Sequence, residues 1–204
     1  MKKFLYFFIS SVVVIFFSFS LYALNDVKYL CFLSELSGGN NSIKKYLLYR
    51  IYKNDEKNSV FGEISELILS EKYKFSEDVF IRILGVIGDD RSIPFLMKIY
   101  IDNQNIENKR YKIISAINSL GIIGDKKIVP FLEKLLEKDN EGYYVSRSLY
   151  FLTGVKNKYL NSSGTYQEIY ITPKEKKIRK IVLESVGRER SIDEMFYLDE
   201  IFRL

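Results

Sequence analysis

The sequence lacks histidine and tryptophan, and it contains a single cysteine among its 204 residues. Without histidine, the chain cannot build a Ser-His-Asp triad or a histidine-based metal site from its own residues. One cysteine allows neither an internal disulfide nor a CxxC redox motif. The patterns GxGxxG, GxSxG and the P-loop are also missing, and no metal-ligand spacing occurs. These absences favour a protein that is not an enzyme and needs no cofactor and no metal.

The charge is nearly balanced, with 31 basic and 26 acidic residues and a formal net charge of +5. Residues 1–23 hold two of the lysines and no acid, so the body of the chain, residues 24–204, has a net charge of +3. A value this small bears on solubility and is not the basic signature of a nucleic-acid-binding protein. We therefore do not expect nucleic acid as a partner.

The N-terminal residues have the layout of an export signal. Lys2 and Lys3 precede a stretch without any charge that runs to Ala23, which is a basic region followed by an apolar one. The stretch is also long enough to be an uncleaved anchor through residues 4–23. Both alternatives carry the body of the chain across the membrane, because the lysines stay inside. Since the bias toward Lys, Ile, Asn, Phe and Tyr is typical of AT-rich bacterial genomes, we expect the periplasm or the periplasmic face of the inner membrane.

The body of the chain repeats itself. Residues Gly85–Leu96 read GVIGDDRSIPFL and residues Gly121–Leu132 read GIIGDKKIVPFL, so the second copy begins 36 residues later and shares seven of twelve positions. A third, weaker copy begins at Gly154, with Asn157 in the place of the motif's second glycine. Because asparagine also tolerates a left-handed backbone, the third copy is expected to turn at Asn157. Internal repeats of this length are typical of stacked helical units.

Each copy predicts a helix, a tight turn and a second helix. Apolar residues at helical spacing precede each pair of glycines. Gly88 and Gly124 are expected to end the first helix in the left-handed conformation. Asp89 and Asp125 follow at once and are expected to cap the next helix.

The remaining repeat positions concern packing. Gly85 and Gly121 lie inside the first helix, where glycine costs about 1 kcal/mol relative to alanine. A glycine that recurs in spite of this cost is expected to let a neighbouring helix approach closely. Pro94 and Pro130 lie four to five residues into the expected second helix, where they are tolerated with a kink.

These motifs resemble the HEAT repeat, in the short form also seen in bilin-lyase-type proteins. The resemblance rests on Leu84–Leu96 and Leu120–Leu132, which match the pattern LGxIGDxRxxPxL, and it covers roughly residues 76–154. It implies an all-α fold, an α-α superhelix of stacked helical hairpins that binds proteins through the face formed by its second helices. The resemblance implies no reaction.

The chain is thus expected to have four parts: a signal or anchor, N-terminal helices, HEAT-like repeats, and C-terminal helices that cap the open end of the stack. These parts span residues 1–23, 24–72, 73–160 and 161–204. Within them, residues 42–53 and 60–72 favour amphipathic helices. Residues 166–171 alternate weakly between polar and apolar side chains, which favours a short extended segment.

Two capping boxes predict where the last helices begin. Thr172-Pro173-Lys174-Glu175 has proline at the first helical position, and Ser191-Ile-Asp-Glu194 has the same cap pattern. The first of these helices is expected to stop at Gly187, and the second is expected to run to about Arg203.

The repeat register also nominates a binding stripe. Lys74, Arg110 and Tyr143 each lie eleven residues before a repeat glycine, namely Gly85, Gly121 and Gly154. Arg147 lies seven residues before Gly154. Equivalent positions line up along a stack of repeats, and arginine and tyrosine are enriched at interaction hot spots. We therefore expect Lys74, Arg110, Tyr143 and Arg147 to contact a protein partner.

The sequence favours a protein-binding scaffold or adaptor of the cell envelope. Two alternatives remain open at this point. One is a structural envelope protein that stays tethered through residues 4–23. The other is an enzyme of the bilin-lyase type, which nothing but the repeat supports.

Overall fold

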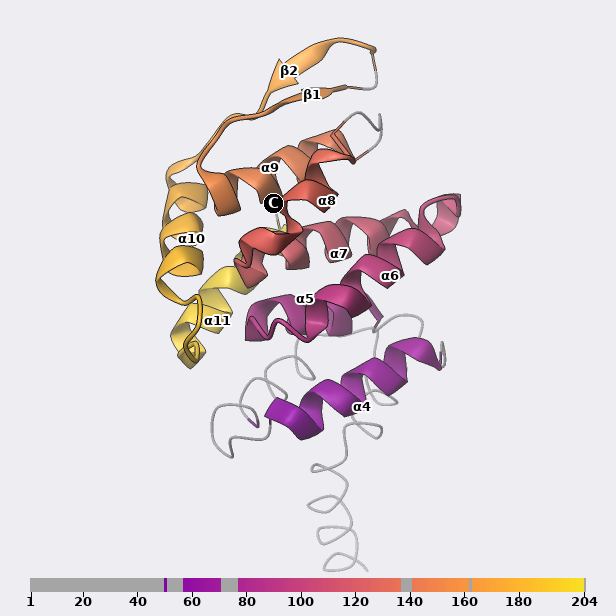
Figure 1. The fold of residues 1–204 in the computed structure, drawn as a ribbon, viewed down its shortest axis with the longest axis vertical. Helices are drawn as coiled ribbons and strands as arrows, with labels where there is room; N and C mark the ends of the chain where they lie inside the picture. Colours follow the sequence, from indigo (N-terminus) through magenta and orange to yellow (C-terminus); the bar gives the residue numbers. More distant parts are fainter. Residues whose placement is uncertain (1–49, 51–56, 71–76, 137–140, 162, 204) are drawn as a thin grey trace, which may run out of the picture.

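The computed structural model describes residues 50, 57–70, 77–136, 141–161 and 163–203. These ranges are mostly helical and contain one small antiparallel hairpin (Figure 1). The α-helices are α4 (Lys57–Leu69), α5 (Glu77–Ile87), α6 (Ser92–Asn103), α7 (Arg110–Ile123), α8 (Val129–Glu133), α9 (Gly142–Thr153), α10 (Pro173–Glu184) and α11 (Ile192–Asp199). Short 3₁₀ helices are η1 (Glu107–Lys109), η2 (Lys126–Ile128) and η3 (Glu200–Arg203), and the strands are β1 (Lys158–Leu160) and β2 (Tyr166–Glu168). The all-α expectation is confirmed in this coarse form.

The helices form three layers. The middle layer is the row α5, α7 and α9, in which each helix packs against the next. On one side of this row, α6 packs against α7 and α8 packs against α9. On the other side lie α10, which contacts α9 and α7, and α11, which contacts α5 (Figure 1). Helix α4 packs against α5 at one end of the row, and the hairpin packs against α9 at the other.

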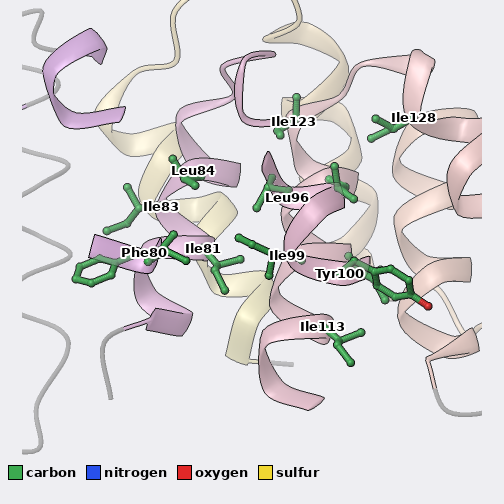
Figure 2. Close-up of a cluster of buried hydrophobic side chains, with 14 of the residues drawn as sticks. Phe80, Ile81, Ile83, Leu84, Leu96, Ile99, Tyr100, Ile113, Ile123 and Ile128 are labelled. Carbon is green, nitrogen blue, oxygen red and sulfur yellow. The ribbon is translucent and has the colours of Figure 1, made fainter. Parts of the chain in front are cut away.

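The larger core lies between the middle row and its neighbours α4, α6 and α8. It is almost entirely aliphatic, and Figure 2 shows part of it, including Leu84 of α5, Leu96 of α6 and Ile123 of α7. Leu84 and Leu96 are fully buried. Burying a side chain of this size contributes roughly 1.5–3 kcal/mol, so these contacts stabilise the packing of the repeats.

A second, smaller core faces the other way. Each helix of the middle row contributes one of its residues Val86, Ile122 and Phe151 to this core. The remaining members come from α10, α11 and η3, which we call the C-terminal layer: Ile178, Val182, Met195, Leu198 and Ile201. The sequence places these helices at the open end of the stack. In the structure they lie along its side and cover all three helices of the middle row, because each of those helices has an apolar residue on that face.

The tight turns are confirmed at the first two repeats. Gly88 and Gly124 follow α5 and α7 with φ angles of 76° and 91°, in the left-handed region. Asp125 accepts a hydrogen bond from the Lys127 amide at 2.8 Å, and Asp89 accepts one from the Arg91 amide at 3.0 Å. Because α6 begins only at Ser92, Asp89 caps the turn that leads into this helix and not the helix itself.

The third copy differs from its expected register. Gly154 follows α9 with a φ angle of 80°, so Gly154 and not Asn157 takes the place of Gly88 and Gly124. The chain then runs into β1 where the first two copies continue into a second helix. The sequence alignment matched Gly154 with Gly85 and Gly121, the first glycines of the motif, and so placed the third copy three residues out of register. The error arose because the sequence does not show where the helix ends.

All three prolines of the sequence lie in the first turn of a helix. Pro94 is the third residue of α6, Pro130 the second of α8 and Pro173 the first of α10. The first four amides of a helix have no partner within the helix, so a proline there removes no hydrogen bond. The expected kink is consequently not needed, since the two repeat prolines lie closer to the helix start than the sequence indicated.

The helices of the middle row approach each other through glycine, as predicted. A Cβ atom placed on Gly85 would lie 2.6 Å from the Cα of Ser119, and one on Gly121 would lie 2.6 Å from the Cβ of Ser148. Such distances are too short for carbon atoms that are not bonded. The Ser119 hydroxyl donates to the Ile81 carbonyl at 2.9 Å, and the Ser148 hydroxyl donates to the Ile117 carbonyl at 3.0 Å. The same contact thus occurs between α5 and α7 and again between α7 and α9.

Other predicted elements are also found. Both capping boxes are complete, at the starts of α10 and α11. Of the expected extended segment 166–171, residues Tyr166–Glu168 form β2, and their partner β1 was not expected. The helix expected over residues 60–72 is observed as α4, from Lys57 to Leu69. The expected signal or anchor in residues 1–23 lies outside the described residues, and so does the helix expected over residues 42–53, apart from Arg50.

Candidate functional site

A cleft of about 500 Å³ lies beside the repeat turns. Two of its walls are the turns that follow α5 and α7, with Gly88, Asp89 and Asp90 on one and Asp125 on the other. The third wall is the loop Val186–Glu189, which joins α10 to α11. We call this feature the turn cleft. It exists because the repeat turns and the C-terminal layer meet there.

The repeat walls of the turn cleft are acidic. The carboxylate of Asp89 accepts hydrogen bonds from Nε of Arg91 at 2.9 and 3.0 Å, and Arg91 Nη2 adds a further ion pair. Asp125 lies 3.7 Å from the ammonium group of Lys127. Asp90 is exposed at the rim. Asp125 thus caps the 3₁₀ helix η2, whereas Asp89 caps only the turn before α6, and the paired Arg91 and Lys127 offset part of the negative charge of these two carboxylates.

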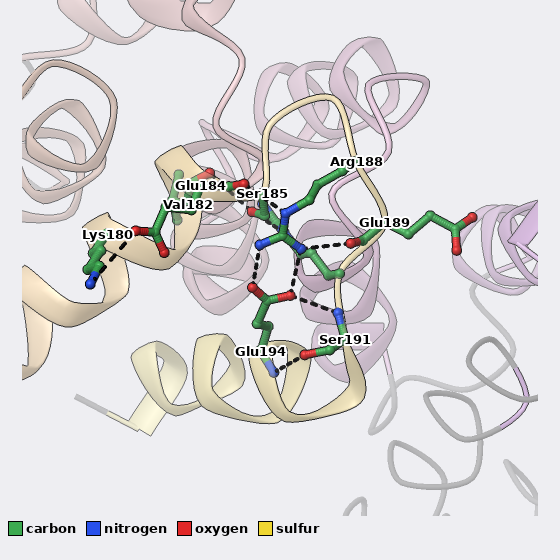
Figure 3. A network of polar contacts seen from close by, with 9 residues as sticks. Lys180, Val182, Glu184, Ser185, Arg188, Glu189, Ser191 and Glu194 are labelled. Atoms are coloured by element: carbon green, nitrogen blue, oxygen red, sulfur yellow. Dashed lines mark hydrogen bonds and ion pairs between the residues drawn. The ribbon is translucent and has the colours of Figure 1, made fainter.

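The loop wall is held by an ion pair between Arg188 and Glu194 (Figure 3). Nη1 and Nη2 of Arg188 donate to the two oxygens of Glu194 at 3.0 and 2.6 Å. Glu194 also accepts from the amide of Ser191 within the capping box of α11. The hydrogen bond from Arg188, with that from Ser191, lowers the pKa of Glu194 to about 2. The carboxylate is consequently ionised at any physiological pH and fixes the loop to the start of α11.

Below this loop, Arg190 ties the C-terminal layer to two helices of the middle row. Its Nη1 donates to the carbonyls of Gly85 and Val86 at 3.0 Å. Its Nη2 donates to the carbonyls of Ile122 and, at 3.2 Å, Ile123. These four carbonyls end α5 and α7, where helices have unsatisfied acceptors and a partial negative charge. Only 6% of Arg190 is exposed, and burial lowers its pKa to about 10, which still leaves it charged at neutral pH.

Arg179 binds the end of the third helix of the row, α9, in a similar way. Its Nε donates to the Tyr150 carbonyl in the last turn of α9 at 3.1 Å. The glycines at these helix ends leave room for both arginines. A Cβ on Gly88 would lie 2.7 Å from the Cζ of Arg190, and one on Gly154 would lie 2.7 Å from Nη2 of Arg179. Nothing in the sequence marked either arginine, because an arginine on an exposed helix face and one that caps a distant helix look alike.

The residues of the predicted binding stripe are placed differently from one another. Lys74 lies outside the described residues. Arg110 begins α7 with its side chain 54% exposed, and its Nε lies 3.6 Å from Glu141, just before α9. Tyr143 is half-buried in α9, and its ring contacts Tyr159 of β1 edge-on at 5.8 Å. Of these two residues, Arg110 is thus exposed, and Tyr143 is only partly so.

Arg147, in contrast, is only 1% exposed and does not face solvent. Its Nη2 donates to Asn118 of α7 at 2.9 Å, and its guanidinium lies 5.5 Å from the ring centroids of Tyr143 and Tyr144. Burial lowers its pKa. With Gly154 aligned to Gly88 and Gly124, position 147 corresponds to Ile81 and Ile117, which are both core residues. The shifted register of the third copy therefore explains why a buried arginine was nominated for the stripe.

The most enzyme-like pair of side chains in the described residues is closed to solvent. Glu77 and Lys112 form an ion pair at 2.6 Å, and the Tyr111 hydroxyl donates to the same carboxylate at 3.1 Å. Glu77 is 1% exposed and Lys112 is 4% exposed. A general acid or base must reach its substrate, so this pair serves packing between α5 and α7. Sequence reasoning missed it, since the partners are 35 residues apart and no motif joins them.

Within the described ranges, no cluster of three or more potential ligands could hold a metal ion. None of the helices there has both the length and the apolar character needed to cross a bilayer. Compared with known proteins, the chain matches no family model, no curated protein and no solved structure.

Proposed function

We propose that this chain is a short HEAT-like α-solenoid that serves as a non-enzymatic protein-binding scaffold or adaptor of the bacterial cell envelope. The observation that carries the proposal is the repeated contact in the middle row. Glycine of one helix meets serine of the next at α5–α7 and again at α7–α9. Repetition of one contact between successive units is what a solenoid requires, and solenoids function mainly as binding surfaces.

The turn cleft is the best candidate for the binding site. Its walls contribute the carboxylates of Asp89, Asp90, Asp125 and Glu189 and one basic side chain, Arg188. Asp89 and Asp125 are each paired with a cation beside the cleft, so Asp90 at the rim is the acidic side chain to which we give most weight. Charge complementarity across an interface speeds association and selects partners. The cleft therefore suits a partner segment that carries lysine or arginine. Ile87, Ile123 and Val186 provide apolar contact in the same cleft.

Arg110 and Tyr143 are a second contact in this proposal. They begin α7 and α9, whereas the turn cleft lies at the far ends of α5 and α7. Both residue types are enriched at interaction hot spots. A partner that touched both places would extend from one end of the middle-row helices to the other.

The envelope location rests on the sequence, through the basic and apolar residues 1–23. Export, with or without retention of residues 4–23 as a tether, would place the described helices on the far side of the inner membrane. There the scaffold would meet periplasmic proteins or the periplasmic domains of membrane proteins.

Charge reversal in the turn cleft tests the proposal. The variant Asp90→Lys should lower capture of the partner after in-cell crosslinking and mass spectrometry at least threefold, because it places a cation at the acidic rim. Glu133→Lys is the matched control, since Glu133 is exposed near the end of α8, away from the cleft. Capture by Asp90→Lys equal to that of the control, with unchanged helicity, would rule the cleft out as the binding site.

The second contact has its own variant. Substituting Arg110 and Tyr143 together by alanine should weaken partner capture while leaving the circular dichroism spectrum unchanged. Unchanged capture would remove these residues from the proposal and leave the turn cleft alone. No reproducible partner for the wild-type protein would contradict the scaffold function itself.

A further inference from the structure

The positive charge of the chain is concentrated in one segment. Residues 155–180 hold seven basic and two acidic residues, a net charge of +5, although the whole body of the chain, residues 24–204, has only +3. The rest of the body therefore has a net charge of −2. Of the two acids, Glu175 is 2% exposed and belongs to the capping box of α10, whereas Glu168 lies at the surface. The segment thus presents an excess of positive charge to solvent.

Much of this charge is not neutralised by acidic neighbours. Lys174 pairs with Glu200, and Lys180 pairs with Glu184. The other lysines of the segment are exposed and form no ion pair within the described residues: Lys156, Lys158, Lys176 and Lys177. Lys177 lies 4.1 Å from the ring centroid of Tyr197, a contact that leaves its charge in place. These ammonium groups are therefore available to a negatively charged partner.

The outer face of the hairpin adds a tyrosine to these lysines. Lys158 lies directly opposite Glu168 in the ladder, and Tyr166 is two residues before Glu168. Opposite residues share a face of a sheet, and so do residues two apart in a strand. Tyr159 belongs to the other face, where its ring meets Tyr143 of α9. Lys158 and Tyr166 therefore lie on the face that points away from α9.

Two tyrosines of this segment are unusually exposed. Tyr166 is 68% exposed and Tyr170 is 79% exposed, the highest values among the large apolar and aromatic side chains of the described residues. Tyr170 lies between Ile169 and Ile171, which are both buried, so the extended chain holds its ring outward. The aromatic side chains are thus displayed in the same segment as the unpaired lysines.

The hairpin and α10 meet beside the end of α9, against which both of them pack. A Cβ on Gly154 would lie 2.7 Å from Nη2 of Arg179, so the middle of α10 lies against the chain that leads into β1. Lys156 follows Gly154 by two residues, and Lys176 precedes Arg179 by three, about one helical turn. Figure 1 shows the chain passing from β2 into α10 on this side of the molecule. Lysines of both elements therefore lie on neighbouring parts of the surface.

Lysine and tyrosine together suit the boundary between a lipid bilayer and water. Clustered lysines are attracted to anionic headgroups, and their methylene stems can lie along apolar surface. Tyrosine has an apolar ring and a polar hydroxyl, and it is enriched where one side of a surface is apolar and the other is wet. The signal or anchor expected in residues 1–23 would bring the chain to a membrane in either case.

We propose that a basic–aromatic face docks on the anionic phospholipid headgroups of a membrane. This face consists of Lys156, Lys158, Tyr166, Tyr170, Lys176 and Lys177. The lysines contact lipid phosphates, and the tyrosine rings lie at the level of the headgroups. The face uses the first two turns of α10, whereas the turn cleft lies beyond the last turn of this helix. The inference therefore does not rest on the proposed scaffold function.

A fluorophore on the full-length protein tests the docking. With Cys31→Ser removing the native thiol, Val155→Cys places an environment-sensitive dye beside the face, and Ile101→Cys places one on α6. The two positions have matched exposures, 56% and 51%, and α6 lies on the other side of the middle row from α10. Vesicles of phosphatidylcholine with about one third phosphatidylglycerol should shift the emission to the blue at position 155 and not at position 101. Because the readout is local, membrane binding through residues 1–23 does not produce this pattern.

Charge reversal shows whether the lysines are responsible. At a fixed vesicle concentration, Lys176→Glu with Lys177→Glu should reduce the shift at position 155 at least about threefold, because lysines near a surface drive the attraction to anionic lipid. Tyr166→Ser with Tyr170→Ser should also reduce it. The matched control is Lys98→Glu with Lys134→Glu, which makes the same charge change at exposed positions in α6 and directly after α8. Circular dichroism checks the fold, and Lys176→Gln with Lys177→Gln replaces the reversal if that variant does not fold.

Several results would overturn the proposal. These are no shift at position 155, equal shifts at positions 155 and 101, a shift that persists with phosphatidylcholine alone, and a shift that charge reversal leaves unchanged. A shift with soluble polyglutamate and none with vesicles would assign the face to an acidic protein and would equally contradict docking on lipid.

Discussion

The middle row and the C-terminal layer are held by different kinds of contact. In the middle row, α5, α7 and α9 approach so closely that glycine is required, and the serine hydroxyls donate to carbonyls of the preceding helix in the row. In the C-terminal layer, arginine side chains reach across to the ends of those helices. The first kind of contact is repeated and rigid, and the second is made once per helix end. This difference teaches that the middle row is built by one repeated helix contact, whereas the C-terminal layer is held by a separate apolar core and by single arginine contacts at the helix ends.

The largest expected effect comes from breaking the close approach in the middle row. Gly121→Ala should destabilise the protein by about 2 kcal/mol, because the new methyl group would overlap Ser148 and push the two helices apart. Gly62→Ala in α4 is the matched control, since a Cβ there would meet nothing within 4 Å.

That control should stabilise the protein by about 0.5–1 kcal/mol, because alanine is the better helix former. Denaturant unfolding followed by circular dichroism measures both variants. If the two substitutions had the same sign, glycine at position 121 would not be there for close packing.

Two other glycines distinguish the effect of the Arg190 contact on stability from the effect of backbone strain. Gly88 and Gly187 have nearly the same φ angle, 76° and 75°. Alanine in this conformation costs about 1–2 kcal/mol at either position. Gly88→Ala should cost about 1 kcal/mol more than Gly187→Ala, because only position 88 has the Arg190 guanidinium within 2.7 Å of the new Cβ.

The comparison of these two alanine variants uses the same unfolding measurement. Equal losses of stability would show that the guanidinium does not need the space at the end of α5. The contact of Arg190 with the helix end would then be loose, and the contrast between the two regions would disappear.

The smallest effect is expected inside the C-terminal layer, at Glu194. Its pKa in the folded protein is lowered to about 2 from an ordinary value near 4.5, chiefly by the hydrogen bond from Arg188. The ionised carboxylate thus stabilises the fold above pH 4.5, and this contribution is lost as the pH falls toward 2. For such a surface ion pair it amounts to less than about 1 kcal/mol.

Glu194→Gln removes this pH dependence. The wild type should be slightly more stable than the variant at pH 6, and the difference should shrink between pH 4.5 and pH 2. Urea unfolding at a series of pH values measures it. A difference that stays constant over this range would mean that Glu194 acts through its shape and not through its charge.

Local chemistry explains what the sequence could predict. Gly85 and Gly121 had an identifiable cost inside a helix, so their recurrence indicated close packing, and the structure confirms it. The capping boxes at Thr172 and Ser191 involve residues three apart, so the pattern was complete in the sequence. The third repeat was wrong in register, because an isolated glycine matches either position of the motif.

The contacts of the buried and helix-capping arginines could not be predicted from the sequence. Arg179 and Arg190 find acceptors on other helices that lie up to 105 residues away. Those acceptors are backbone carbonyls, which every residue has, so no pair of residue types in the sequence predicts the contact. Arg147 was nominated for the surface and lies buried against Tyr143 and Tyr144. Burial of a long polar side chain depends on its surroundings in the fold, and Arg147 is enclosed by the two tyrosines of its own helix and by Asn118 of α7.

The central claim is that the chain binds a protein at the turn cleft. The most direct measurement is site-specific photo-crosslinking in living cells, with the photoreactive residue at position 90 on the cleft rim. Position 176, on the exposed face of α10, is the control. We predict one dominant protein adduct from position 90 that is missing from position 176. No adduct at position 90, or the same adducts at both positions, would contradict the claim.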